Sequence, residues 1–393
     1  MNKLKLLTGF VCLALASASH AKPGKLDKAV TANNTFGFEL YQQIKRAEST
    51  PNENRLVSPV SAYFAVSMAS NGARGETESA IRKTIAASQL TRAQLNDANL
   101  DLLKTLNSRK GVTLAVANSV WTREGLGLLE TFADSARRYY QADARELDFT
   151  APEAAKTING WVAEKTHEKI KEVVKDPIQD DFYLINATYF KGSWTHPFPE
   201  QWTKPEAFAT ANGVKQVPTL HGEFVTKYVK GRDFEVVEMP YGETQEASLL
   251  LFATDNLDRL EDTMTVEQWN QVNQALDKAK DYQVTLSMPK FEFEDSADLV
   301  QPLSNLGMGI AFGGGADFRD LTRNNMALSQ AFQKTYIRLD EKGTEAAAVT
   351  VIAGATSVPM YERVTVKADK PFLVAIRDNA TKALLFLGAV VNP

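Results

Sequence analysis

A run of sixteen residues without a charge, from Ala346 to Tyr361, constrains the fold of this chain more than any other feature. Its residues are small or apolar, which favours burial, yet charged residues bound it, at 340–342 on one side and at Glu362 and Arg363 on the other. Taken alone, such a run is typical of a buried core strand or an alanine-rich helix. The glycine before it, Gly343, gives the chain a flexible point at its start.

The first 21 residues have the layout of a secretory signal peptide. Lys3 and Lys5 precede an apolar run at 6–18, and small residues follow up to Ala21. The run is shorter than the roughly 20 apolar residues that a membrane-spanning helix needs. We therefore expect cleavage near Ala21 and a secreted protein, extracellular or periplasmic.

The remaining residues, 22–393, are expected to form a single domain, because no linker or repeat interrupts them. The chain's one cysteine, Cys12, leaves with the signal peptide, so a large core must replace disulfides. Val11 before it argues against a lipid anchor. Net charge is −4, and −6 once Lys3 and Lys5 are removed (−4 − 2), which favours neither a nucleic-acid nor a membrane partner.

Periodicity predicts an α+β class. Apolar residues at helical spacing predict helices at 34–48, 58–72, 79–90 and 152–170, the first capped by Asn34 or Thr35. Apolar, β-branched and aromatic runs predict strands at 112–123, 182–194, 234–242, 247–254 and 281–294. A C-terminal pair is predicted at 363–378 and 382–393, with a turn at Asn379-Ala380 between them. Strands that are apolar on both faces, such as 384–391, belong in buried sheets.

No motif in the chain is typical of an enzyme. His167, His196 and His221 lack metal-ligand spacing, and Lys171 stands where a second zinc histidine would follow His167. The glycines at 307–315 have the wrong spacing for a dinucleotide site and favour a loop. We therefore expect no catalytic residue, no metal and no cofactor.

The segment EKGTEAAAVT, residues 341–350, resembles the hinge of inhibitory serpins. Further segments resemble serpin motifs in the family's order, and together the resemblance covers residues 30–393: NRLVSPVSAYFAVSMASNGARGETESAI (54–81), INATYFKGSW (185–194), MPKFEFE (288–294), ADFRDLT (316–322), KPFLVAIRD (370–378) and LFLGAVVNP (385–393).

The resemblance implies the serpin fold: a large central mixed β-sheet, two further sheets, about nine helices and a reactive loop at about 341–371. It implies a suicide inhibitor, here a secreted one, and not an enzyme. The partner would be a target serine protease, held as a covalent acyl-enzyme while the cleaved loop inserts into the central sheet. Cysteine proteases are an alternative partner. No basic helix face indicates a heparin-type site, and a monomer is expected.

Insertion as a strand requires small core-facing residues at every second position. The resemblance assigns the hinge to Glu341, Gly343, Thr344, Glu345, Ala346, Ala347 and Ala348. Alternation from Thr344 predicts uncharged core-facing residues at Thr344, Ala346, Ala348, Thr350, Ile352 and Gly354. Glu345 is expected on the solvent face. A non-inhibitory carrier or folding helper, the alternative function, would be expected to carry bulky or charged residues at these positions.

Other family positions match residues that the pattern alone would not single out. Ser58, Ser61 and Asn186 match the shutter, whose side-chain hydrogen bonds break when the sheet opens. Trp194 matches the breach, where the inserting arm enters first. Alone, Ser58 would be a helix cap and Trp194 a core residue. Gln333 replaces a shutter histidine found in many serpins; it can donate and accept hydrogen bonds but cannot provide pH sensitivity.

The reactive bond has two candidate positions. Counting Gly343 as the first of fifteen residues places it at Ser357-Val358, which the length of the loop favours. Counting back from the segment KPF at 370–372 places it at Met360-Tyr361. Small residues before Val358 suit elastase-like or subtilisin-like proteases, whereas Met360 suits chymotrypsin-like ones.

Overall fold

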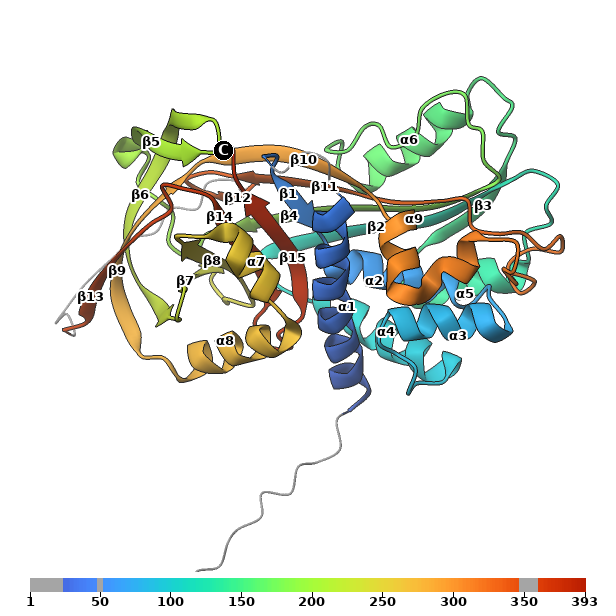
Figure 1. Cartoon of the computed structure of the whole chain (residues 1–393), viewed down its shortest axis with the longest axis horizontal. Helices are drawn as coiled ribbons and strands as arrows, with labels where there is room; N and C mark the ends of the chain where they lie inside the picture. Colours follow the sequence, from blue (N-terminus) through green and yellow to red (C-terminus); the bar gives the residue numbers. More distant parts are fainter. Residues whose placement is uncertain (1–23, 48–51, 346–359) are drawn as a thin grey trace, which may run out of the picture.

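The computed structural model describes residues 24–47, 52–345 and 360–393. The predicted signal peptide and residues 346–359 lie outside the described residues. Strands form two sheets around which helices pack, so the predicted α+β class is confirmed (Figure 1).

Nine α-helices lie in the described parts of the chain. Their bounds are α1 Lys25–Ala47, α2 Pro59–Ala69, α3 Gly75–Thr84, α4 Arg92–Asn107, α5 Glu130–Tyr140, α6 Ala154–Lys165, α7 Leu257–Thr263, α8 Val266–Lys278 and α9 Val300–Leu303. The predicted first helix is present but begins nine residues earlier than expected. The capping prediction is wrong, because Asn34 lies inside α1 and its side chain bonds backbone groups of Lys382 and Leu384.

One other helix prediction and one loop prediction need correction. The helix predicted at 79–90 begins at Gly75 and ends at Thr84. Short helical turns, Ser304–Met308 and Gly309–Phe312, form where the glycine-rich loop was predicted.

The first sheet is the central one and has the order β10-β11-β12-β4-β2-β3. Its strands are β2 Val112–Arg123, β3 Asp143–Leu147, β4 Phe182–Ser193, β10 Phe291–Asp298, β11 Gln330–Leu339 and the two-residue β12 Gly343–Thr344. The β4–β11 and β2–β3 pairs are parallel and the other pairs are antiparallel, so the sheet is mixed. The two-residue β12 is thus inserted at one end, between β11 and β4.

The remaining strands form a nine-stranded arrangement with the order β1-β15-β14-β8-β7-β6-β9-β13 and β5 beside β6. Their bounds are β1 Arg55–Val57, β5 Lys204–Thr210, β6 Gly213–Lys230, β7 Phe234–Tyr241, β8 Ala247–Thr254, β9 Asp281–Pro289, β13 Glu362–Lys367, β14 Phe372–Asp378 and β15 Leu384–Val390. The eighteen-residue β6 joins what would otherwise be two smaller sheets. Residues 213–219 of β6 pair with β5, residues 219–227 with β9 and residues 228–230 with β7.

Two strand predictions merged what the structure separates. The segment 281–294 divides at Lys290 into β9, in the nine-stranded arrangement, and β10, in the central sheet. The segment 363–378 divides into β13, which pairs with β9, and β14, which pairs with β8 and β15. The turn predicted at Asn379-Ala380 is present between β14 and β15.

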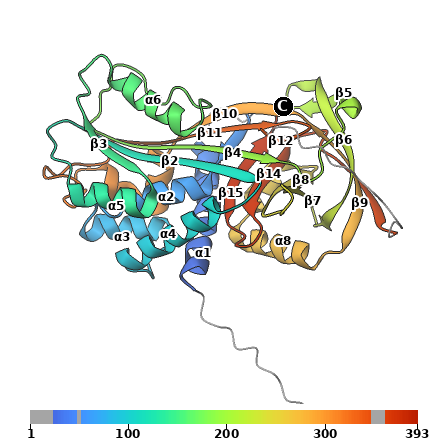
Figure 2. The same ribbon diagram turned by 180° about the vertical axis from the view of Figure 1, so that it is seen from behind.

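Helix α2 packs between the two sheets. Every one of its residues is buried, and it contacts β2 and β4 of the central sheet on one side and β15 on the other (Figure 2). Pro59 occupies its first turn, where the missing N–H costs no hydrogen bond. The residues at the start of α2 therefore lie directly beneath the middle of the central sheet.

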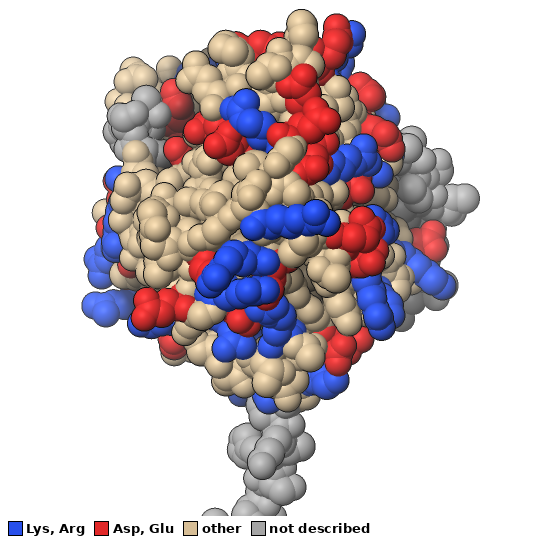
Figure 3. Space-filling model, turned by 90° about the vertical axis from the view of Figure 1, so that its right-hand side faces the viewer, with Lys and Arg blue, Asp and Glu red and all other residues tan. Residues whose placement is uncertain are grey.

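Charged side chains of both signs are interspersed on the face that carries α3 and α5 (Figure 3). Arg92 bonds both Glu78 of α3 and Asp320, and Arg319 pairs with Asp317. Among the described residues, no helix is long and apolar enough to cross a membrane.

Candidate functional site

Strands β4 and β11 of the central sheet are paired along only part of their length. β4 and β11 pair directly from Tyr183 and Gln330 up to Tyr189 and Tyr336, and we call this contact the seam. Beyond it the two strands diverge, and β12 lies between them, with Thr344 paired to Gly192 of β4 and Leu339 of β11. The first residues of the hinge therefore already occupy a strand position in the sheet.

Thr344 faces the core. Its side chain is fully buried, and its hydroxyl is 2.6 Å from the hydroxyl of Tyr241. Burial raises the pKa of the Tyr241 phenol above its usual value, and the hydrogen bond to Thr344 offsets this only in part. The phenol therefore keeps its proton, so one of the two hydroxyls can donate to the other.

Trp194 holds the turn that leads into the hinge. Its indole stacks on Tyr241, with ring centroids 4.6 Å apart and an interplanar angle of 12°. The indole N–H donates to the carbonyl of Asp340 at 3.0 Å, and its backbone N–H donates to the carbonyl of Lys342 at 2.9 Å. Gly343 follows with φ +154°, a conformation that side chains disfavour. Trp194 is thus a core residue that also holds the backbone just before Gly343 in place.

Glu341 anchors the hinge from the other side. Its carboxylate accepts hydrogen bonds from Lys290 at 2.8 and 3.1 Å and from the Thr203 hydroxyl at 2.8 Å. Its carbonyl accepts from the Phe198 N–H at 2.9 Å. Burial alone would raise the pKa of the Glu341 carboxyl, but the hydrogen bonds and the charge of Lys290 outweigh it and hold that pKa below its usual value of 4.5.

The expectation for Glu345 was wrong in one respect. Its side chain is only 14% exposed and forms an ion pair with Lys169. Lys169 belongs to the segment after α6, which covers the outer face of the sheet at this point, so a side chain directed away from the core does not reach open solvent. Glu345 has φ +53°, so the chain leaves the strand conformation there.

The predicted shutter residues lie together at the middle of the seam. Asn118 of β2, Asn186 of β4 and Gln333 of β11 lie opposite one another in register. The Asn186 amide donates to Asn118 Oδ1 at 2.5 Å and to the Ser61 hydroxyl of α2, and its own Oδ1 accepts from Gln333 Nε2 at 2.5 Å. This network crosses the seam, so separating β4 from β11 must break it.

Gln333 also joins the seam to α2. Its Oε1 accepts from the backbone N–H of Ser58 at 2.8 Å, and its Nε2 donates to the Ser58 carbonyl at 3.0 Å. The Ser58 hydroxyl donates to the carbonyl of Leu385 at 2.9 Å and does not cap α2. Interpreting Ser58 as a simple helix cap is therefore wrong. Gln333 makes this network without a titratable group of its own.

Of the two candidate reactive bonds, Met360-Tyr361 lies in the described residues. Met360 is fully exposed and Tyr361 is partly exposed, immediately before β13 begins at Glu362. Ser357 and Val358 lie outside the described residues, as do Ala346, Ala347 and Ala348.

Sequence reasoning missed three residues of this site. Asn118 could have been found, since an asparagine within the apolar strand VTLAVANSVW indicates a buried polar partner. Tyr241 and Lys290 carry no such signal. Tyr241 ends β7 and Lys290 lies between β9 and β10, and they reach the hinge only through the tertiary fold.

The histidines do not form a site. His167 follows α6, with its ring 5.8 Å from that of Tyr189, whereas His196 follows β4 and His221 lies on β6. The described parts of the chain contain no group of three or more His, Cys, Asp or Glu residues that could hold a metal ion.

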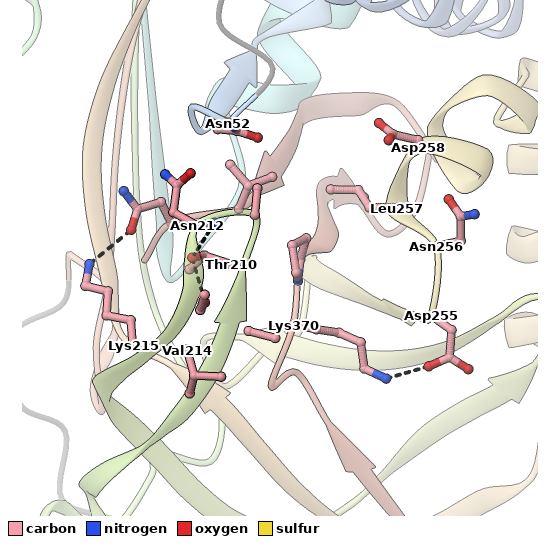
Figure 4. Close-up of a pocket in the computed structure, with 16 residues that line it drawn as sticks. Asn52, Thr210, Asn212, Val214, Lys215, Asp255, Asn256, Leu257, Asp258 and Lys370 are labelled. Atoms are coloured by element: carbon pink, nitrogen blue, oxygen red, sulfur yellow. Dashed lines mark hydrogen bonds and ion pairs between the residues drawn. The ribbon is translucent and has the colours of Figure 1, made fainter.

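A large cavity lies apart from the hinge. It has a volume of about 730 Å³ and lies between the β5–β6 turn, the start of α7 and the C-terminal residues (Figure 4). Two of its lysines already have partners: Lys370 pairs with Asp255 at 2.5 Å, and Lys215 bonds Asn392 at 3.0 Å.

The model of the serpin family, described as serine protease inhibitor, matches residues 31–393. The chain belongs to the serpin family. Iripin-3 of Ixodes ricinus is 30% identical over 98% of this chain and 99% of its own. A serpin-like protein of Thermococcus kodakarensis is 32% identical over 95% of this chain and 87% of its own.

Solved serpin structures have the same fold. The native state of tengpin, a thermophilic serpin, has a TM-score of 0.83 and 28% identity, covering 93% of this chain and 94% of its own. Human thyroxine-binding globulin, solved in complex with thyroxine, has a TM-score of 0.85 and 27% identity, covering 94% of this chain and 100% of its own. The predicted serpin fold is confirmed. Serpins in general inhibit proteases and are not enzymes, although the globulin shows that the fold also carries ligands.

Proposed function

We propose that this protein is a secreted suicide inhibitor of serine proteases with elastase-like or subtilisin-like specificity. One observation carries the proposal: β12 already places the first residues of the hinge between β4 and β11, with a small, uncharged side chain facing the core. A non-inhibitory relative would not need this position to accept a strand.

The register of β12 predicts where the rest of the arm would go. Thr344 lies opposite Gly192 and Leu339 in antiparallel pairs, so each later residue would meet the preceding residue of both neighbours. Thr350 would then lie opposite Asn186 and Gln333, and Gly354 opposite Phe182, the first residue of β4. Thr350 would thus enter between the side-chain amides of Asn186 and Gln333. Insertion would break the hydrogen bond that joins these two amides.

The same register supports Ser357-Val358 as the reactive bond. Fourteen steps from Gly343 to Ser357 span about 46 Å at about 3.3 Å per residue. Such an arm would carry Ser357 three residues beyond Gly354, just past the far end of β4. If the reactive bond followed Met360 instead, the arm would have three further residues outside the sheet. Such an arm would hold a trapped protease less tightly.

The chemistry follows from the loop's position. The protease serine Oγ attacks the carbonyl carbon of Ser357, and the peptide bond to Val358 breaks. The new amine leaves with a proton, and an ester joins the protease to Ser357. Insertion would then add roughly ten backbone hydrogen bonds, each worth about 0.5–1.5 kcal/mol net, or on the order of 10 kcal/mol against release.

Secretion rests on the N-terminal layout. Lys3 and Lys5, the apolar run after them and the small residues ending at Ala21 support export and cleavage. Expression of the full chain with N-terminal sequencing of the exported product tests this, and a product that retains residues 1–21 would contradict it.

The central test mixes the mature protein with elastase and follows the products on denaturing gels and by mass spectrometry. A complex that survives boiling, with a released peptide beginning at Val358, is expected. A peptide beginning at Tyr361 would keep the mechanism and move the bond. Cleavage without a complex, repeated with subtilisin, chymotrypsin and a cysteine protease, would contradict inhibition and favour a carrier or folding helper.

A further inference from the structure

Two of the large apolar side chains exposed in the described parts of the chain lie at one shallow cavity. Trp202 is 47% exposed and Val225 is 44% exposed. They line a cavity of about 280 Å³, whose walls include Pro197, Pro199 and Phe224. This volume is at the low end of the range for small-molecule pockets, about 300–1,000 Å³. The exposed apolar side chains of Trp202 and Val225 suit contact with an apolar side chain of a protein partner. We call this surface the Trp202 patch.

The patch adjoins the start of the reactive loop. Trp202 precedes Thr203, whose hydroxyl bonds the Glu341 carboxylate at 2.8 Å. On the same side, the N–H of Phe198 donates to the Glu341 carbonyl, and Phe198 lies between Pro197 and Pro199 in the chain. The segment that carries the patch is therefore fixed to the hinge.

The patch also adjoins the end of the reactive loop. Val225 of β6 lies opposite Gln283 of β9, and Gln283 lies opposite Arg363 of β13. The Arg363 guanidinium donates to Gln283 Oε1 at 3.1 Å. At about 4.8 Å between neighbouring strands, Val225 is roughly 10 Å from the point where the loop rejoins the sheet.

We propose that the Trp202 patch is a docking surface for the target protease, in addition to the reactive bond itself. The inference rests on the proposed function, because the protease is brought here by the loop. A protease bound between the two loop ends would cover about 800 Å² of this protein, a disc of roughly 16 Å radius, which includes the patch. Exposed tryptophans beside rigid walls are typical of residues that dominate such interfaces. The partner would contribute an apolar side chain from a surface loop.

The test compares Trp202→Ser/Val225→Ser with Val214→Ser. Val214 is a matched control, since it is 73% exposed on the same strand, β6, but lines the cavity of Figure 4. The second-order rate constant for elastase inhibition should fall about tenfold or more in the double variant and stay unchanged in the control. The stoichiometry of inhibition and the boiling-resistant complex should be preserved in both variants, because the loop and the seam are untouched.

A second measurement follows the binding of elastase in the absence of loop cleavage. Elastase with its catalytic serine replaced by alanine should change the Trp202 fluorescence, as judged against Trp202→Phe. An unchanged rate constant with normal complex formation would overturn the docking surface and leave the proposed function intact. Equal losses in the double variant and the control would also overturn it. Absence of any complex, even for the unmodified protein, would overturn both. A dimer that dissociates on Trp202→Ser would make the patch a contact between two copies of this chain, which also contradicts the proposal.

Discussion

Replacing Thr344 by arginine tests the hinge most directly. Thr344 is fully buried between β4 and β11, against Tyr241, which itself stacks on Trp194. The hydrogen-bond partner of its side chain is the uncharged Tyr241 hydroxyl, so a guanidinium there would be buried without a counter-charge from that partner. We expect Thr344→Arg to keep the hinge out of the sheet and to oppose insertion after cleavage.

The cost can be estimated. An unpaired ion loses several kcal/mol of solvation on burial in a protein, and about 4 kcal/mol is a reasonable value for one that cannot relax fully. Because about 1.36 kcal/mol corresponds to a factor of ten in rate, insertion would slow about a thousandfold. Deacylation of the acyl-enzyme would then be faster than insertion of the loop. The protease would cleave the protein as an ordinary substrate and be released.

The assay titrates elastase with each variant and compares residual activity with the gel products. Unmodified protein should inhibit close to one-to-one, and Thr344→Arg should be cleaved without a complex. Thr344→Ala keeps a small side chain and should inhibit normally. Thr244→Arg, on the exposed turn after β7, adds the same charge outside the sheet and should also inhibit normally. If Thr344→Arg forms the complex as efficiently as the unmodified protein, β12 is not where insertion begins.

Three further substitutions test the supports of the hinge and seam. Gln333→Ala should lower the free energy of unfolding by about 3 kcal/mol, measured in urea, because three buried hydrogen bonds are lost; a loss below about 1 kcal/mol would contradict the network. Trp194→Phe should cost about 1–3 kcal/mol in the same assay, since the Asp340 carbonyl is left unpaired; no loss would show that this bond is unimportant. The lowered pKa of Glu341 means that its bond to Lys290 contributes stability above pH 4.5, which is lost as the pH falls through the folded-state pKa. The unmodified protein should therefore lose more stability than Glu341→Gln between about pH 5 and pH 3, and parallel curves would refute this.

Strand alternation was sufficient to predict the orientation of hinge residues but not their surroundings. A period of two directs Thr344 to the core and Glu345 to the opposite face, and this follows from local geometry alone. That the opposite face is covered at Glu345 depends on Lys169, about 175 residues earlier in the chain. No local pattern encodes such a contact, so the prediction of solvent exposure failed.

The predictions of where helices and strands begin and end failed for similar reasons. Asn34 is a good helix cap by propensity, yet it lies inside α1 because the β14–β15 turn supplies partners for its amide. The segment 281–294 is a continuous β pattern, but its two halves join different sheets on either side of Lys290. The same Lys290 bonds Glu341, so the point where the strand divides also fixes the hinge.

The seam also offers a reason why β12 ends at Thr344. Tyr189 and Tyr336 form the last direct pair between β4 and β11, and their rings lie 6.5 Å apart on the outer face. Lys169 lies over the Tyr336 ring at 5.7 Å and pairs with Glu345, so the hinge is held just before this pair. By the register of β12, the first residue to separate the tyrosines would be Ala347, whose side chain is small enough to pass between them. The same covering segment would thus stop the intact hinge at Thr344 and still admit the arm once cleavage frees it.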